Sequence, residues 1–454
     1  MSINSTPCTL DFPSSTKNLF LQREHRRLQC ETGGSKVLVV GTTSDYVDLL
    51  RKSNPGRVLY LTDQSERDKA GESRPLEYEE IVCDLEEDVA LILQKIRVHL
   101  DRWDISLEGV VSFDCESMEL AALLARELSL SYPPPDSIRL CRDKFVTKTI
   151  WQAKGIPCPH HKLALSAEDV MDFWQEVGGP VVVKPLSGSG SELVFLCSSR
   201  KECERATHMI LDGLAERKEM PLYSHATTSF VAEEFVAGNE FSCDFTIKRG
   251  RIEILRLTRK LKYTEKPFGT INGYIITDWQ RAGINQEQLS LIFKLGAEAL
   301  GLSDVICMVD FIVDHDKILL LEMTPRPGGD CIPFLLHKAA GFDVLSYFVE
   351  FAGNRTAASP VTCVSGKELV ALRLHAERSG EVAKIKTDRL SLDPRTREIN
   401  LVGEAGHRIT MPPSDYDSWY LGYILFQPAP GLPVEQQCRE LRCLLEVEMY
   451  NADN

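Results

Sequence analysis

Three short, mainly apolar runs in the first 130 residues are separated by helical patterns. They cover Lys36–Gly41, Arg57–Thr62 and Leu107–Phe113, and in the first two the apolar residues are continuous rather than alternating. Such runs are typical of parallel strands that are buried on both faces. The amphipathic segment 118–128 after the last run predicts a helix. We therefore predict a doubly wound α/β domain, with a parallel sheet between layers of helices.

The middle of the chain predicts two further lobes. A helix is expected at 144–153, and two more begin after Ser166 and Ser199, each of which has an acidic residue three positions later, as in a capping box. With strands at 180–184, 193–197 and 230–236 they make a small α+β lobe. Strands at 241–248, 251–257, 304–313 and 317–323, and a long helix ending at Gly301, then predict a lobe richer in antiparallel strands.

The prolines at 133–135 predict an extended connector, because consecutive prolines forbid a helix. A boundary there divides the chain into a loosely ordered leader (1–35), the α/β domain (36–135), a two-lobed unit (136–355, small lobe about 155–237) and a C-terminal lobe (356–454). In the last segment we expect short strands up to Phe426 and a helix from Val434 to Tyr450.

Composition and charge narrow the classes of protein. The formal charge is −14 with no dense Lys/Arg run, which argues against nucleic-acid binding. No apolar stretch approaches the roughly 18 residues of a membrane span, and the N-terminus lacks the pattern of a secretory signal. The 14 cysteines include no CxxC pair and no zinc-type cluster, which indicates reduced thiols. We expect a cytoplasmic protein that binds neither nucleic acid nor membrane.

The segment 307–326 carries the most informative pattern. If a turn is centred on Asp316, then Asp310 and Glu322, six residues to either side, become opposed partners in a hairpin. Opposed Cβ atoms lie about 4.5 to 5.5 Å apart. Two carboxylates held so close repel one another unless a proton or a cation separates them, and Mg²⁺ prefers such oxygen ligands. The alternative is a solvent-facing hairpin with ordinary surface carboxylates.

Two other features suit phosphate chemistry. Thr324 and Arg326 share a strand face with Glu322, since side chains alternate along a strand. Lys184 ends a Val-rich strand and is followed by the loop 187–191 (SGSGS), whose backbone N–H groups can approach a phosphate closely. The loop does not match the P-loop pattern, and a hairpin with a flexible Ser/Gly turn is the alternative.

The segments 231–244 and 259–262 are open to either of two interpretations. The first can offer backbone amides to a flat heterocycle and a carboxylate, Glu240, to ribose hydroxyls, but acidic residues beside Gly-Asn also occur in ordinary turns. The second supplies Arg259, Lys260 and Lys262 before a glycine-containing loop at 263–274. These cations would either contact phosphate or form a solvated basic loop.

Taken in order, these motifs resemble the ATP-grasp superfamily. They are Lys144, Lys184 with its Ser/Gly loop, the stretch 233–240 and the cluster of Asp310, Glu322 and Arg326. The resemblance spans about 110–426. The segment from Val382 through Gly422 is similar to the C-terminal lobe of the family's carboxylate–amine ligases, including the L-amino-acid ligases. It implies a doubly wound N-terminal domain, two ATP-grasp lobes and a C-terminal lid lobe.

The resemblance also implies roles for the matched residues. The residues that would bind ATP are Lys144, Lys184, Ser187, Gly188, Ser189, Gly190, Ser191, Glu233, Glu234, Phe235, Val236 and Glu240. Those that would bind metal are Asp310, Glu322 and Thr324, and those that would act on the transferring phosphate are Arg326 and Lys260. The family pattern has Asn where Thr324 stands, and one hydroxyl would bind a second metal more weakly than an amide carbonyl.

The implied activity is an ATP-dependent ligase that joins a carboxylate to an amine through an acyl phosphate and releases ADP and phosphate. The implied cofactors are ATP and Mg²⁺, with Mn²⁺ as a substitute, and the substrates would be small molecules such as amino acids; a homodimer is left open. Two alternative functions remain open. One is a carboxylating enzyme similar to biotin carboxylase or the purine-pathway enzymes, and the other is a nucleotide-binding regulatory protein with weak turnover.

Overall fold

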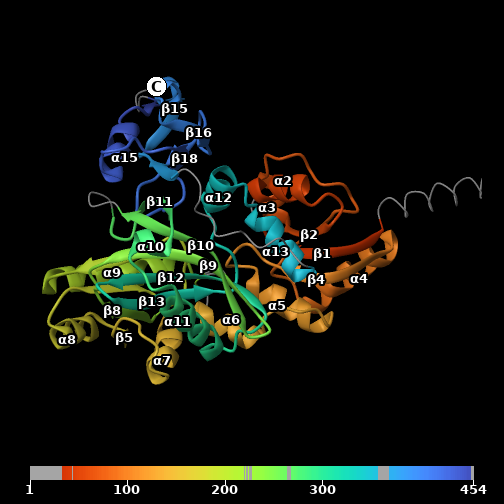
Figure 1. Ribbon diagram of the computed structural model, residues 1–454, viewed down its shortest axis with the longest axis horizontal. Helices are drawn as coiled ribbons and strands as arrows, with labels where there is room; N and C mark the ends of the chain where they lie inside the picture. The colour runs from red at the N-terminus through yellow and green to blue at the C-terminus, as the bar shows by residue number, and fades with distance from the viewer. Residues whose placement is uncertain are drawn as a thin grey trace, which may run out of the picture.

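The computed structural model describes residues 33–42, 44–218, 220, 223, 228–262, 267–355 and 368–450. Within these ranges the strands form one parallel sheet and three antiparallel sheets (Figure 1). The predicted leader lies outside the described residues except for 33–35, and the first strand begins at Gly34. The mixed α/β fold predicted from the sequence is confirmed.

The N-terminal sheet is parallel, with strand order β3-β2-β1-β4. Alternate residues of β1 point to opposite faces: Leu38 and Val40 pack on helices α4 and α5, whereas Val37 and Val39 pack on α2, α12 and α13. The apolar run of β1 is therefore buried on both faces. The element bounds are β1 Gly34–Val40, β2 Val58–Asp63, β3 Glu80–Cys83, β4 Ile105–Val111, α2 Ser44–Ser53, α3 Gln64–Lys69, α4 Val89–Trp103 and α5 Met118–Glu127.

A small antiparallel sheet, with order β5-β8-β6-β7, forms the next layer with helices α8 and α9. The Ser166 side chain accepts a hydrogen bond from the Asp169 backbone N–H, and the Asp169 side chain accepts one from the Ser166 backbone N–H, which is the predicted capping box. The bounds are β5 His161–Ala164, β6 Val181–Pro185, β7 Phe195–Cys197, β8 Phe230–Glu234, α8 Ala167–Val177 and α9 Arg200–Glu216.

The largest sheet has eight antiparallel strands in the order β13-β12-β9-β10-β11-β14-β18-β16. Helices α7 and α11 cover its first strands, where Trp151 and Phe293 are fully buried. The bounds are β9 Asn239–Lys248, β10 Arg251–Lys262, β11 Ile271–Thr277, β12 Val305–Asp314, β13 Lys317–Thr324, β14 Val370–His375, β16 Thr396–Leu401, β18 Tyr420–Phe426, α7 Lys144–Ala153, α10 Trp279–Ala282 and α11 Gln286–Ala299. Strands β14, β16 and β18 come from the C-terminal segment, so that segment continues the central sheet.

Three local predictions were wrong. The helix expected from Val434 to Tyr450 ends at Arg442, because the alternating residues Glu446–Met449 form strand β19 and pair with β15. The loop expected at 263–274 gives way at Ile271 to β11, which pairs with β10. The proline connector is shorter than expected, since Pro135 begins helix α6 at a position where a missing N–H costs nothing.

The remaining elements are helices α6, α12 and α13 and the other elements of the C-terminal segment. Helix α6 is Pro135–Arg142, and the C-terminal elements are β15 Gly380–Lys386, α14 Asp388–Leu392, β17 Arg408–Ile409, α15 Val434–Arg442 and β19 Glu446–Met449. Helices α12 (Ile332–Ala340) and α13 (Val344–Ala352) are strongly apolar. No single helix among the described residues has the length and hydropathy of a membrane span; α12 and α13 meet those criteria only as a pair, bent by 103°.

The hairpin of β12 and β13 pairs Asp310 with Glu322, as the sequence predicted. Its turn lies between Asp314 and Lys317, so it is centred half a residue before Asp316, and Phe311 faces Leu320. A register shift between Asp310 and Phe311 then adds one residue to β13 and brings Glu322 opposite Asp310. The predicted partners therefore meet because a bulge compensates for the position of the turn.

Helix α11 allows a matched test of the packing. Leu289 is fully buried in the core under the large sheet, whereas Leu291, two residues along the helix, is 57% exposed. We expect Leu289→Ala to lower the free energy of unfolding by about 2 to 5 kcal/mol, and Leu291→Ala to change it by no more than about 0.5 kcal/mol. Denaturant unfolding of both variants measures the difference, and equal losses would contradict this packing.

Candidate functional site

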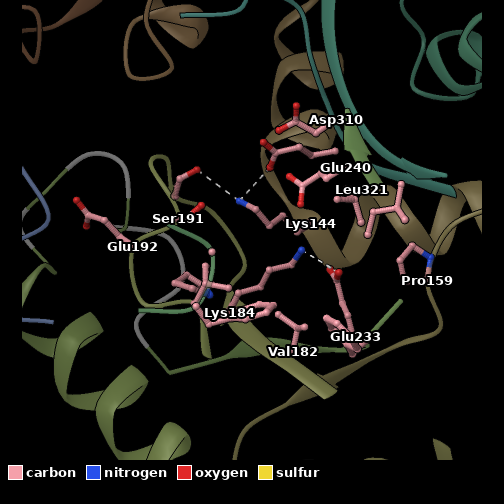
Figure 2. A pocket seen from close by; sticks show the side chains of 18 of the residues that line it. Lys144, Pro159, Val182, Lys184, Ser191, Glu192, Glu233, Glu240, Asp310 and Leu321 are labelled. Carbon is pink, nitrogen blue, oxygen red and sulfur yellow. Dashed lines mark hydrogen bonds and ion pairs between the residues drawn. The ribbon is translucent and has the colours of Figure 1, made fainter. Parts of the chain in front are cut away.

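Two neighbouring cavities lie where the small sheet faces strands β9, β10, β12 and β13. The first cavity is bounded by Lys184, residues 233–236 and Lys262 (Figure 2). The second cavity extends past Thr324 and Arg326 to Arg373. The residues that line both are Lys144, Gly188, Ser189, Gly190, Ser191, Lys260, Asp310 and Glu322. These shared residues form the junction of the two cavities.

A buried ion bridge closes one end of the first cavity. Glu233 on β8 lies 2.8 Å from Lys184 on β6 and 2.8 Å from Lys148 on α7, and Lys148 Nζ also donates to the Leu321 carbonyl at 2.6 Å. Figure 2 shows Lys184 and Glu233 pointing toward one another. Burial by itself would raise the pKa of Glu233, but the ammonium groups of Lys148 and Lys184 lower it to about 2. Burial also lowers the pKa of Lys148 to about 8.

A second charge cluster lies at the opposite wall. Lys260 Nζ is 2.9 Å from Glu240 and 2.6 Å from Asp310 Oδ2, and Lys262 Nζ is 2.7 Å from Glu240. Burial opposes ionisation of Glu240, yet the two lysines hold its pKa at about 2. Arg259 from the same basic segment instead pairs with Glu435 and lines neither cavity. Because side chains alternate along β10, Lys260 and Lys262 line the first cavity, whereas Arg259 does not.

The opposed carboxylates Asp310 and Glu322 occupy the junction of the cavities. Burial and the nearby carboxylates of Glu322 and Glu240 raise the pKa of Asp310, against the effect of Lys260. Burial would also raise the pKa of Glu322, but the surrounding lysines, of which Lys144 at 3.7 Å acts most strongly, lower it. One carboxylate therefore ionises more readily than the other, as expected for two acids in close contact.

The carboxylate pair fits a magnesium ion. Within the described residues no group of three or more His, Cys, Asp or Glu side chains is arranged to hold a metal. However, Asp310 Oδ1 is buried and has no hydrogen-bond partner in this part of the chain. Mg²⁺ is usually bound by one or two protein carboxylates together with substrate phosphates and water, and it does not need a larger protein cage.

The Ser/Gly loop (187–191) lines the junction of the two cavities. Lys144, at the start of α7, donates to the Gly188 carbonyl at 3.4 Å, and burial lowers its pKa. Three loop positions have positive φ: Gly188 at 153°, Gly190 at 62° and Ser191 at 62°. Glycine adopts such angles without strain, so Gly188 and Gly190 allow the loop to turn sharply beside the lysines.

The second cavity is rich in guanidinium groups. Arg326 donates to Cys115 Sγ at 3.1 Å and to the Pro327 carbonyl at 2.7 Å. Arg142 donates to the Cys115 carbonyl at 2.9 Å, and Arg373 lies 2.8 Å from Asp330. An excess of positive charge at this end favours an anionic group in the space between them.

A fully buried ion pair fixes the backbone after Arg326. Asp244 and Arg256 meet at 2.8 Å with both side chains fully buried, and Asp244 also accepts the Gly328 N–H at 2.9 Å. A Cβ at Gly328 would lie 2.0 Å from Arg256, so only glycine allows this approach. The loop that follows Arg326 is thereby held against β9 and β10.

All the site residues predicted from the sequence line one or both cavities. Those in the first cavity are Lys144, Lys184, Ser187, Gly188, Ser189, Gly190, Ser191, Glu233, Glu234, Phe235, Val236, Glu240, Lys260, Asp310 and Glu322, and Thr324 and Arg326 line the second. Sequence reasoning missed Lys148, Arg142 and Arg373. Lys148 follows Lys144 by one helical turn, which was a usable signal, whereas Arg373 joins the site only through pairing of β14 in the large sheet.

Comparison with known families agrees with this geometry. Residues 177–333 match the model of the ATP-grasp domain. The chain carries an ATP-grasp domain. The matched range begins just before the strand of Lys184 and ends just after Arg326, so it covers most of the first cavity, though not Lys144, and includes the carboxylate pair and Arg326. ATP-grasp enzymes generally use ATP and Mg²⁺.

Similar proteins include ligases. A D-alanine–D-alanine ligase of Aromatoleum aromaticum is 28% identical over 217 residues, which is 45% of this chain and 63% of that protein. Carnosine synthase 1 of Mus musculus is 25% identical over 364 residues, 76% of this chain and 42% of that protein. The chain thus spans less than two thirds of either relative. An L-amino acid ligase from Bacillus licheniformis shares the fold, with a TM-score of 0.70 at 19% identity over 92% of this chain and 99% of that one.

The buried bridge at Glu233 makes a pH-dependent prediction. Glu233→Gln leaves Lys148 buried without its counterion, so we expect the free energy of unfolding at pH 7 to fall by about 3 to 5 kcal/mol. The pKa of Glu233 is about 2 in the folded protein and ordinarily 4.5. The difference in free energy of unfolding between the wild type and Glu233→Gln should therefore be largest above about pH 4.5 and should decline as the pH falls toward 2. Urea unfolding at several pH values measures it.

A surface variant in the same small lobe serves as the control for this measurement. Glu176 on α8 is exposed. Glu176→Gln should leave the free energy of unfolding and its pH dependence unchanged. A pH-independent difference between wild type and Glu233→Gln would contradict the assigned ion bridge.

Proposed function

We propose that this protein is an ATP-dependent ligase that joins a carboxylic acid to an amine through an acyl phosphate, releasing ADP and phosphate. The observation that carries the proposal is the Asp310–Glu322 pair at the junction of a lysine-lined cavity and an arginine-rich one. A nucleotide in the first cavity would direct its terminal phosphate at an acid in the second. Both the ATP-grasp domain and the ligase relatives support this proposal.

In this proposal the first cavity binds ATP. The ammonium groups of Lys144 and Lys184 hold the phosphates beneath the Ser187–Ser191 loop, whose backbone N–H groups complete the cradle. The segment 233–236 lines the adenine ring, and Glu240 accepts hydrogen bonds from the ribose hydroxyls. Lys148 keeps Glu233 ionised and so holds Lys184 in position.

Asp310 and Glu322 would hold Mg²⁺, with Thr324 contributing its hydroxyl. The bound ion would neutralise phosphate charge and align the terminal phosphoryl group. Asp310 Oδ1 is the atom best suited to it, because it is buried and has no partner among the described residues. Lys260, on the opposite side of Asp310, would stabilise the same developing charge.

The chemistry requires alignment and charge neutralisation more than covalent help from the protein. An oxygen of the acid attacks the terminal phosphorus, ADP departs, and Arg326 stabilises the transferring phosphoryl group. The amine then attacks the acyl carbon, phosphate departs, and the nitrogen loses a proton. The loop over the junction and the strands of the C-terminal segment would keep water away from the acyl phosphate.

The substrates belong to the same proposal. The guanidinium groups of Arg142 and Arg373 and the carboxylate of Asp330 could together bind a zwitterion, which supports amino acids as the acid, the amine or both.

A cytosolic location is also proposed, because the described cysteines are free thiols and the cytosol keeps thiols reduced.

Turnover of site variants tests the proposal. We expect Lys184→Ala and Glu322→Ala to fold and to lose about 100-fold or more of the Mg²⁺-dependent release of ADP and phosphate, since each removes charge that faces the transferring group. Release is measured with pooled amino acids and small carboxylic acids, with and without bicarbonate. Near-normal turnover in either variant at saturating Mg²⁺ would overturn the site.

The hairpin itself supplies a matched control. Asp310→Asn removes a carboxylate at the junction, whereas Asp316→Asn removes one at the exposed turn of the same hairpin. Only the first should abolish turnover. Turnover that depends on bicarbonate and needs no other acid would favour a carboxylating enzyme instead.

Thr324 makes a separate prediction about the metal. An amide carbonyl is a better Mg²⁺ ligand than a hydroxyl in the same position, so Thr324→Asn should lower the Mg²⁺ concentration for half-maximal turnover several-fold. Thr324→Val, which keeps the shape and loses the oxygen, should raise it. If both variants match the wild type, Thr324 does not contact the ion.

A further inference from the structure

A third cavity, of about 200 Å³, lies between the N-terminal sheet and the large sheet. Its walls come from the end of β4, the segment 131–133, the adjoining ends of β9 and β12, and helix α13, which Figure 1 shows beside β4. It shares no lining residue with the first cavity and shares only Arg326 with the second. The cavity is therefore separate from the proposed reaction site but contacts one of its arginines.

Most of the residues that line this cavity are apolar, and several of them are buried. Val110, Val111, Ile306 and Phe348 are all 7% exposed or less. Apolar cavities of about 150 Å³ bind a benzene ring in other proteins, so this volume accommodates a ring or a branched chain with a small polar group. A ligand would gain by removing its own apolar surface from water.

Tyr132 and Arg326 are among the residues that line the cavity. The Tyr132 hydroxyl is buried and has no hydrogen-bond partner among the described residues. Burial and the Asp114 carboxylate raise the pKa of Tyr132, so its hydroxyl keeps the proton and can donate. The Arg326 guanidinium acts on the same hydroxyl from close by. The lining thus contains a hydroxyl that keeps its proton and a guanidinium, and both kinds of group donate to an anionic acceptor such as a carboxylate.

The rim of the cavity is also basic. Lys248 lies over the Phe351 ring at 5.0 Å, and the neighbouring Arg249 is exposed. The one carboxylate in the lining, Asp304, already accepts the Arg249 backbone N–H. The electrostatic field at the entrance therefore attracts anions.

We propose that this cavity is a second ligand site, for a small carboxylic acid with an aromatic or branched apolar body. The apolar body packs between β4 and α13, and the carboxylate accepts hydrogen bonds from Tyr132 and Arg326. Occupancy also draws Arg326 away from the second cavity and slows phosphoryl transfer. This last effect rests on the proposed function, whereas binding does not.

Binding of benzoate to the full chain, without ATP, tests the site. Isothermal titration calorimetry should show benzoate binding about tenfold more tightly than benzamide, which has the same shape and no charge. Tyr132→Phe removes one donor and should weaken benzoate binding about tenfold, with benzamide unchanged. Ala352→Phe places a ring in the cavity and should abolish binding of both compounds, with its fold verified by circular dichroism.

A variant in the second cavity separates the two sites. Arg373→Ala removes a cation from the second cavity only, so benzoate affinity should be unchanged. A loss in Arg373→Ala, equal binding of benzoate and benzamide, or full affinity in Tyr132→Phe would each overturn the proposal.

The coupling to catalysis has its own measurement. In the turnover assay benzoate should lower kcat of the wild type without raising KM for ATP, and it should leave Ala352→Phe unaffected. Benzoate binding with no effect on kcat would overturn the coupling through Arg326 alone. Absence of turnover under every condition would overturn the proposed function and leave the binding result intact.

Discussion

Two buried carboxylates that face one another are the constraint on which the site depends. Asp310 and Glu322 are held opposite by backbone hydrogen bonds of the β12–β13 hairpin, so they cannot separate to relieve their repulsion. The surrounding cations compensate: Lys260 contacts Asp310, and Lys144 lies beside Glu322. The lysines in turn need buried partners, which Glu233 and Glu240 provide. One unfavourable pair thus accounts for the alternating charges along the first cavity.

This charge arrangement links elements that belong to different layers. The Glu233 bridge joins β6 and β8 of the small sheet to α7, and Lys148 reaches the backbone of β13. Buried pairs of this kind contribute little net stability but strongly penalise the loss of one partner. We infer that they fix how the small sheet faces the large sheet, and therefore the width of the cavity between them.

The large sheet brings the C-terminal segment into the same site. Strand β14 pairs with β11, and this pairing places Arg373 opposite the carboxylate of Asp330 in the second cavity. The N-terminal domain contributes Cys115, next to Arg326. Residues of the N-terminal domain and of the C-terminal segment therefore line the second cavity, and the match to the ATP-grasp model, over 177–333, covers the first cavity more completely than the second.

The sequence alone determined most strands and several helices, because periodicity and capping depend on residues close together in the chain. It also predicted that Asp310 opposes Glu322, although a bulge in the hairpin brings the two opposite one another. It failed for 434–450, where β19 forms only because β15 is available to pair with it. It also did not reveal Lys148, Arg373 or the cavity behind Arg326. Those features depend on the packing of distant segments and on the exact register of long-range strand pairs, and only the tertiary structure decides which buried charges and surfaces then meet.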